Sequence, residues 1–200
     1  MSQTPVRQIG IVLFADVEEL DAVGPWEVLS YWCREYPEDG WAVTTLSPLG
    51  GPVSCAKGLV VQARHSFADC PPLDVLLHPG GRGTRPQLRD RAHLEWVRGQ
   101  QKQVSIMTSV CTGSLVYAAA GLLAGRPATT HWASLDLLGE LDPTIEIRSE
   151  DRFVDAGDVV TSAGVSAGID MALHLVRRLA GVERARQVRR GIQYDPEPPV

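Results

Sequence analysis

The feature that most constrains the fold is a regular alternation of short apolar runs with longer amphipathic segments. Apolar, β-branched runs predict buried strands at residues 8–14, 41–46, 59–63, 73–78 and 104–110, and shorter strands at 145–147, 153–154 and 159–162. Helical periodicity predicts helices at residues 20–32, 88–100, 114–123, 168–179 and 182–192. This alternation predicts an α/β fold: a flavodoxin-like sandwich with a mostly parallel central sheet and helices on both faces. No linker or repeat interrupts it, so we expect one domain over residues 1–200.

Composition excludes several classes of protein. The chain has 200 residues, is 44% hydrophobic and carries a formal net charge of −5, which is typical of a globular domain with a sizeable core. Its net acidity argues against a nucleic-acid partner. No apolar run approaches the roughly 18 residues of a membrane span, so no membrane partner is expected. The first residues also lack the basic-then-apolar pattern of a leader, and we therefore expect a cytoplasmic protein.

The cysteine pattern argues against a metal centre. The four cysteines, Cys33, Cys55, Cys70 and Cys111, include no C-x-x-C pair, and no other metal-ligand spacing is present. We therefore expect free thiols, no bound metal and no cofactor.

Cys111 stands out because it lies at a predicted strand-to-helix turn. A side chain at such a turn projects beyond the carboxyl edge of the sheet, where open α/β folds bind their ligands. Gly113 would allow strand and helix to approach closely, as in a nucleophile elbow. The N-terminus of the following helix favours a thiolate, so a lowered thiol pKa is expected. The competing interpretation, a small buried apolar residue, is the more common one for a free cysteine at an arbitrary position.

A glycine-rich loop follows another predicted strand, at residues 78–83, and contains Gly80 and Gly81. The backbone N–H groups of Gly81 and Thr112 could together face developing negative charge, as an oxyanion-hole pair does. A tight turn without further function is the alternative. Phosphate binding is not indicated, because neither G-x-G-x-x-G nor G-x-x-x-x-G-K is present.

Asp21 is the candidate acidic partner of the thiol. It lies between Leu20 and Ala22 near a predicted helix start, which indicates a partly buried carboxyl with a raised pKa. Such a carboxyl could share one proton with the Cys111 thiol, so that the two titrate as a coupled pair. A simple helix-capping role is the alternative.

Several motifs resemble a known superfamily. Three segments are similar to the PfpI-like superfamily, whose members are relatives of class I glutamine amidotransferase domains. These segments are LHPGGRG (77–83), TSVCTGSLVYAAAGLLAGRPATTHW (108–132) and SAGVSAGID (162–170). Within that superfamily, the segments at 19–29, 65–75 and 193–199 look most like its isocyanide-hydrating members. The resemblance extends over nearly the whole chain.

The resemblance implies a lyase that adds water to an isocyanide and releases an N-formamide, without a cofactor and as a homodimer. It implies that Cys111 is the nucleophile, forming a thioimidate, and that Asp21 is the general acid and base. Thr112 replaces the histidine that follows the nucleophile in protease-like relatives, so peptidase activity is not expected. The resemblance also implies a small-molecule pocket beside these residues, with Gly80, Gly81, Gly113, His131, Val165 and Ser166 as its candidate lining.

Two other functions remain open at this point. Regulators of the AraC type carry a similar stretch in their N-terminal half, which would make the chain a sensing domain that binds a small molecule without turnover. Glyoxalase- or deglycase-type chemistry on carbonyls would use the same cysteine. For His131, a structural role is the alternative to a role in the site.

Overall fold

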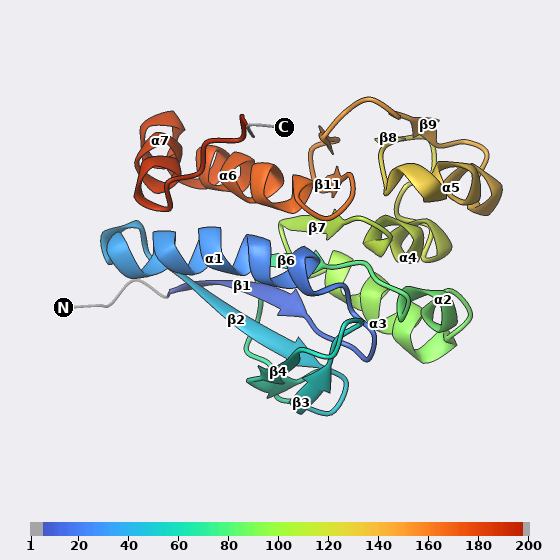
Figure 1. Ribbon diagram of the computed structural model, residues 1–200. Coiled ribbons are helices and arrows are strands. Elements are labelled where there is room, and N and C mark those ends of the chain that lie inside the picture. The colour runs from blue at the N-terminus through green and yellow to red at the C-terminus, as the bar shows by residue number, and fades with distance from the viewer. Residues whose placement is uncertain (1–5, 198–200) are drawn as a thin grey trace.

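A seven-stranded sheet forms the centre of the structure, in the order β10-β11-β7-β6-β1-β2-β5 (Figure 1). The computed structural model describes residues 6–197. Neighbouring strands are parallel except at β10–β11, and the order β2-β1-β6-β7-β11 is the 2-1-3-4-5 order of flavodoxin-like folds. The predicted fold class is therefore confirmed. The strands of the sheet are β1 (Arg7–Val12), β2 (Trp41–Ser47), β5 (His65–Ser66), β6 (Val75–His78), β7 (Ile106–Val110), β10 (Phe153–Asp155) and β11 (Val159–Ser162).

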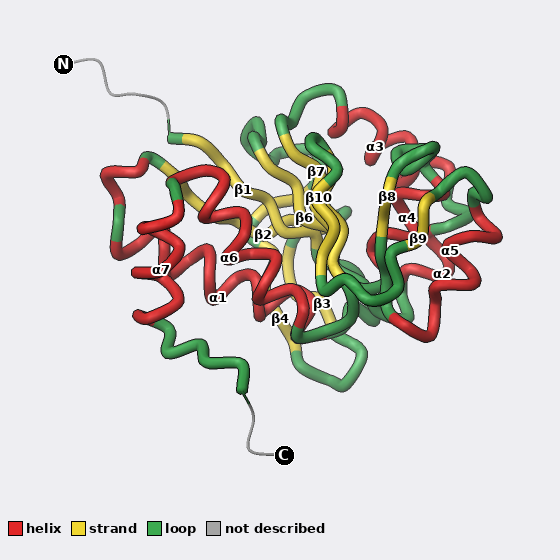
Figure 2. Tube along the Cα trace, turned by 90° about the horizontal axis from the view of Figure 1, so that it is seen from above, coloured by secondary structure: helices red, strands yellow, loops and turns green. Residues whose placement is uncertain are grey.

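Helices cover both faces of this sheet, as Figure 2 shows in the view from above. On one side α1 packs against α6 and α7, and on the other α4 contacts α2, α3 and α5. The helices are α1 (Glu19–Glu35), α2 (Thr84–Gln87), α3 (Arg91–Gln101), α4 (Gly113–Ala119), α5 (Leu135–Leu141), α6 (Ala167–Ala180) and α7 (Val182–Gly191), with 3₁₀ turns at Pro37–Asp39 and Trp132–Ser134. None of the helices in the described part of the chain is long and apolar enough to cross a membrane.

Two predicted strands lie outside the central sheet. The run at 59–63 forms β4 (Val60–Ala63), which pairs antiparallel with β3 (Gly51–Ser54). The run at 145–147 forms β9 (Glu146–Ile147), which pairs with β8 (Pro127–Ala128). Both β4 and β9 are mostly solvent-accessible, because these short ribbons lie beside the sheet rather than inside it. The short helices α2 and α5 are additional to the predicted elements.

The central strands position the loops that matter for function. Every residue of β6, β7 and β11 is buried, as expected for parallel strands covered on both faces. The carboxyl ends of β1, β6, β7 and β11 meet at one edge of the sheet, and the strand order reverses between β1 and β6. Open α/β folds bind ligands at such a reversal. The segments that leave this edge carry Asp21, Gly80, Cys111 and Val165.

Candidate functional site

Cys111 occupies a strained turn between β7 and α4. Its φ angle is 56°, in the left-handed region that residues other than glycine rarely adopt. The backbone is held there because Cys111 N–H donates to the carbonyl oxygens of Ser162 (3.0 Å) and Ala163 (3.1 Å), while Cys111 O accepts from the Thr130 hydroxyl (2.9 Å). Such strain costs about 1–3 kcal/mol and persists only where the surrounding structure imposes it. The geometry is that of a nucleophile elbow.

Glycines allow the neighbouring loop to touch this elbow. A Cβ at Gly113 would overlap the carbonyl oxygen of His78, and a Cβ at Gly80 would lie 2.5 Å from Thr112 N and 2.8 Å from Asp21 Oδ2. No side chain fits at either position without displacing backbone. The loop after β6 therefore lies directly against both the helix start and the Asp21 carboxyl.

Asp21 is fully buried in the first turn of α1. Its Oδ2 accepts a hydrogen bond from Gly80 N–H (2.9 Å), whereas Oδ1 is buried without a hydrogen-bonded nitrogen or oxygen among residues 6–197. Burial raises the pKa of Asp21 to about 7, against the lowering effects of the Gly80 bond and the Cys111 side chain. Of the more distant charges, Glu18 raises this pKa and Lys57 lowers it.

The Cys111 thiol interacts directly with this carboxyl. Burial raises the pKa of Cys111, and the negative charge of Asp21 raises it further, while the backbone N–H groups of Thr112 and Val165 lower it. The expectation of a lowered thiol pKa is therefore wrong, because burial and the Asp21 charge outweigh the N–H groups of Thr112 and Val165. As a coupled pair, the two groups lose a first proton near pH 7 and keep the second into alkaline solution. Above pH 7 they hold one negative charge and one proton between them.

The predicted oxyanion-hole pair is not formed as expected. Gly81 N–H donates to the Thr112 hydroxyl (3.0 Å), which is also 3.2 Å from the Thr84 hydroxyl. The N–H groups that face the Cys111 thiol belong instead to Thr112 and Val165. Val165 has a φ of 49°, so a second strained residue presents its backbone to the Cys111 thiol. The sequence placed Val165 near the site, but its backbone role was not predictable from it.

The remaining predicted residues lie at the edge of the site. The His131 ring packs against Gly164, where a Cβ would lie 2.5 Å from its Cδ2 atom, and His131 Nδ1 accepts from Ala133 N–H (3.2 Å). His131 thus supports the segment that carries Val165. The Ser166 hydroxyl accepts from the Arg152 guanidinium (3.3 Å) at the exposed N-terminal end of α6.

Two further features have no counterpart in the sequence prediction. His78, which the sequence predicts only as the last residue of a strand, is fully buried and contacts His93. Lys57, at the tip of the β3–β4 hairpin, pairs with Glu18 and Glu19, which lie three and two residues before Asp21. Nothing in the local sequence signals either contact, because both join segments distant along the chain. Within residues 6–197, no group of three or more histidine, cysteine or acidic side chains is arranged to hold a metal ion.

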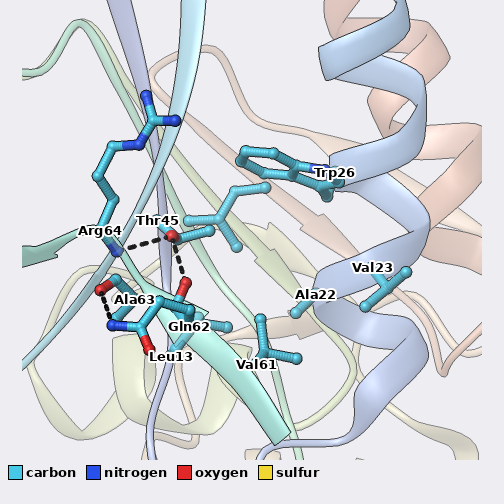
Figure 3. A pocket seen from close by; sticks show the side chains of 10 residues that line it. Leu13, Ala22, Val23, Trp26, Thr45, Val61, Gln62, Ala63 and Arg64 are labelled. Carbon is cyan, nitrogen blue, oxygen red and sulfur yellow. Dashed lines mark hydrogen bonds between the residues drawn. The ribbon is translucent and has the colours of Figure 1, made fainter. Parts of the chain in front are cut away.

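An apolar cavity of about 600 Å³ lies between α1, the strands β1 and β2, and the β4 segment (Figure 3). The Trp26 ring and the Arg64 side chain lie on opposite sides of it in Figure 3. Ala22, the residue after Asp21 on α1, also lines it. Its lining is Ile11, Leu13, Ala22, Val23, Trp26, Thr45, Val61, Gln62, Ala63 and Arg64.

The shared proton predicts a distinctive pH profile for alkylation of Cys111. We expect labelling by iodoacetamide to rise with a midpoint near pH 7 and to level off above pH 8, because the pair gains its single negative charge there. The pKa of Cys33 is raised to about 12 and that of Cys70 to about 11, both by burial, so their labelling should still be rising at pH 9. Peptide mass spectrometry after timed labelling measures all of these thiols in one sample. If Cys111 followed the curve of Cys70, the coupling would be disproved.

Comparison with known proteins gives a consistent assignment. The model of the DJ-1/PfpI family matches residues 7–178. An isonitrile hydratase of Pseudomonas putida is 43% identical over 193 residues, which cover 96% of this chain and 80% of that protein. A solved ThiJ/PfpI family protein from Pseudomonas syringae superposes with a TM-score of 0.85 at 32% identity, covering 97% of this chain and 77% of its own.

Regulators share part of the same domain. The HTH-type transcriptional regulator CdhR of Pseudomonas aeruginosa is 34% identical over 72% of this chain, but the match spans only 42% of the regulator. The chain therefore corresponds to less than half of that protein.

Proposed function

The chain belongs to the DJ-1/PfpI family, and on that premise we propose that it is an isonitrile hydratase that uses Cys111 and Asp21. The observation that carries the proposal is the buried carboxyl–thiol pair at the strand edge, which holds one mobile proton and one negative charge between the two groups. An isonitrile carbon accepts a nucleophile and a proton at the same atom, so this pair offers both reactants it needs. The 43% identity to the isonitrile hydratase of P. putida over almost the whole chain supports the same activity.

In the first half of the reaction, the Cys111 thiolate attacks the terminal carbon of R–N≡C. Asp21 gives its proton to that carbon, so a C–S and a C–H bond form and the enzyme holds a thioimidate, R–N=CH–S–Cys111. The N–H groups of Thr112 and Val165 stabilise the thiolate before attack and after release.

In the second half, water is added and the thiolate leaves. The Asp21 carboxylate takes a proton from water as the oxygen bonds to carbon, and returns that proton to the substrate nitrogen. The resulting R–NH–CH(OH)–S–Cys111 collapses: its hydroxyl proton passes to Asp21, the C–S bond breaks, and R–NH–CHO is released. Thiolate and protonated carboxyl are regenerated, and the net reaction is the addition of one water molecule.

The test is formamide production by the purified protein. Incubation with cyclohexyl and with aryl isonitriles should give one N-formamide per isonitrile consumed, followed by infrared loss of the N≡C stretch and by chromatography. The absence of formamide across several alkyl and aryl isonitriles would overturn the hydratase proposal. Stoichiometric binding with release of unchanged ligand would favour the sensing function, to which the match to CdhR gives independent support.

We extend the proposal to a homodimer. Exposed apolar side chains occur on two elements that border the cavity of Figure 3. They are Leu20 and Val23 on α1, and Leu59 and Val60 at the start of the hairpin's second strand. Adjacent exposed apolar side chains favour contact with another protein surface. Light scattering should give twice the chain mass of 21.7 kDa, and a monomer at micromolar concentration would contradict this.

A further inference from the structure

Two buried histidines next to the site are not used by the proposed chemistry. His78 ends β6 and His93 lies in the first turn of α3, and their Nε2 atoms are 3.0 Å apart. Burial lowers the pKa of His78 to about 3 and also lowers that of His93, so both rings are neutral at working pH. Aromatic rings enclose the pair, namely those of Phe14, Phe67, Trp96 and Tyr117.

The hydrogen bonds fix which nitrogen of each ring carries the proton. His78 Nδ1 is 2.8 Å from the carbonyl oxygen of Pro79, which can only accept, so Nδ1 carries the proton of the neutral ring. His78 Nε2 is then an acceptor. His93 must therefore donate its Nε2–H to His78.

The peptide between Pro79 and Gly80 connects this pair to Asp21. In a trans peptide the C=O and N–H groups lie in one plane and point in opposite directions. His78 holds the C=O edge of this peptide, and the N–H edge donates to Asp21 Oδ2 at 2.9 Å. A hydrogen bond to the carbonyl also polarises the peptide and makes its N–H a stronger donor.

As a consequence, the two carboxyl oxygens of Asp21 differ in which of them can carry the proton. Oδ2 faces an N–H donor, so in the protonated carboxyl the hydrogen must sit on Oδ1, the oxygen without a nitrogen or oxygen partner in the described chain. We propose that His78, held by His93, is a positioning residue that fixes the Pro79–Gly80 peptide and thereby sets the orientation of the Asp21 carboxyl toward Cys111. Only the turnover measurement of this proposal rests on the proposed hydratase function.

The decisive measurement is the pH midpoint of Cys111 alkylation, which needs no substrate. The Gly80 bond lowers the pKa of Asp21 by stabilising its charged form. A loosened peptide should therefore move the midpoint from near pH 7 upward by about one unit. We expect this shift in His78→Leu, which fills the space but cannot donate, and a smaller shift in the same direction in His93→Leu. His78→Asn places an amide N–H near the position of Nδ1 and should restore the midpoint.

A matched control separates positioning from general loosening. Thr108→Val removes a buried hydrogen bond to Leu76 O on the neighbouring strand without touching the Pro79–Gly80 peptide. It should lower the melting temperature but keep the midpoint near pH 7. An unchanged midpoint in His78→Leu, or an equal shift in Thr108→Val, would overturn the proposal. If His78→Leu does not fold, His93→Leu decides, and the wild-type midpoint in that variant overturns it.

Turnover gives a second readout. With isonitrile as substrate, kcat of His78→Leu should fall roughly ten- to a hundredfold while KM changes less than threefold, because orientation of the acid matters after binding. Should the wild type hydrate no isonitrile, the proposed function fails while the alkylation profiles still decide the role of His78.

Discussion

Replacement of Cys111 by alanine is expected to abolish formamide production, to within the rate of the uncatalysed reaction. The covalent route has no substitute nucleophile, because the other groups that act on the thiol are the backbone N–H groups of Thr112 and Val165 and the Asp21 carboxyl, which the proposed reaction uses as acid and base. The Cβ of alanine preserves the backbone at φ 56°, so a melting temperature close to that of the wild type is expected. Initial rates at saturating isonitrile, together with thermal melting, measure both effects.

Cys33→Ala is the matched control for this variant. Cys33 is also partly buried with a raised pKa, but it lies on the last turns of α1, away from the strand edge. Wild-type turnover is expected. Residual turnover above background in Cys111→Ala, or loss of turnover in Cys33→Ala, would show that the nucleophile is misassigned.

Asp21→Asn is expected to lower turnover by a factor on the order of 10² to 10⁴, because the amide keeps the size and hydrogen-bonding capacity of the carboxyl but cannot transfer a proton. The amide oxygen can still accept from Gly80 N–H, so the loop should remain in place. Glu19→Gln is the matched control: it removes a carboxylate from the same helical turn, at a position paired with Lys57, and should retain turnover. Wild-type rates in Asp21→Asn would refute its role as acid and base.

The same substitution is expected to stabilise the fold at alkaline pH. The pKa of Asp21 is raised from 3.8 to about 7, so the folded state favours the protonated carboxyl. The stability that this gives is complete below about pH 4 and is lost as the pH rises to about 7. Asparagine never ionises, so the free energy of unfolding of the variant, measured relative to the wild type, should rise by about 4 kcal/mol from pH 4 to pH 8, given 1.36 kcal/mol per pKa unit. Urea denaturation of both proteins at pH 4 and at pH 8 measures the difference. If the stability of the variant relative to the wild type did not increase from pH 4 to pH 8, the raised pKa of Asp21 would be contradicted.

The sequence predicted the central sheet because its strands carry continuous apolar runs, as in β6 and β7, where every residue is buried. It could not place β4, because a half-exposed strand that pairs only with its hairpin partner has the same local pattern as an edge strand of the main sheet. Likewise β9 pairs with β8, a two-residue strand too short to give any periodic signal.

For the site, the sequence indicated Cys111 and Asp21 because each has a local signal: an elbow in one case, and a carboxyl between apolar neighbours in the other. The direction of the thiol pKa was missed because burial depends on the whole fold, whereas the helix N-terminus is a local feature. The engagement of Gly81 N–H by the Thr112 hydroxyl, and the contact of His78 with His93, also arise only when distant segments meet. Whether His131 and Ser166 contribute to substrate binding stays a prediction.

The arrangement of the site also has a consequence for biosynthesis. Its four contributing segments follow β1, β6, β7 and β11, so they are spread from Asp21 to Val165 along the chain. Parallel strands need long crossovers, and such non-local pairing forms slowly. A ribosome must therefore release most of the chain before the last of these segments can close over Cys111. During that interval the thiol is an ordinary exposed cysteine, with a pKa near 8.5 and free access to oxidants. Chaperone binding or fast closure of β11 against β7 would shorten the period in which a newly made molecule can be inactivated before its first turnover.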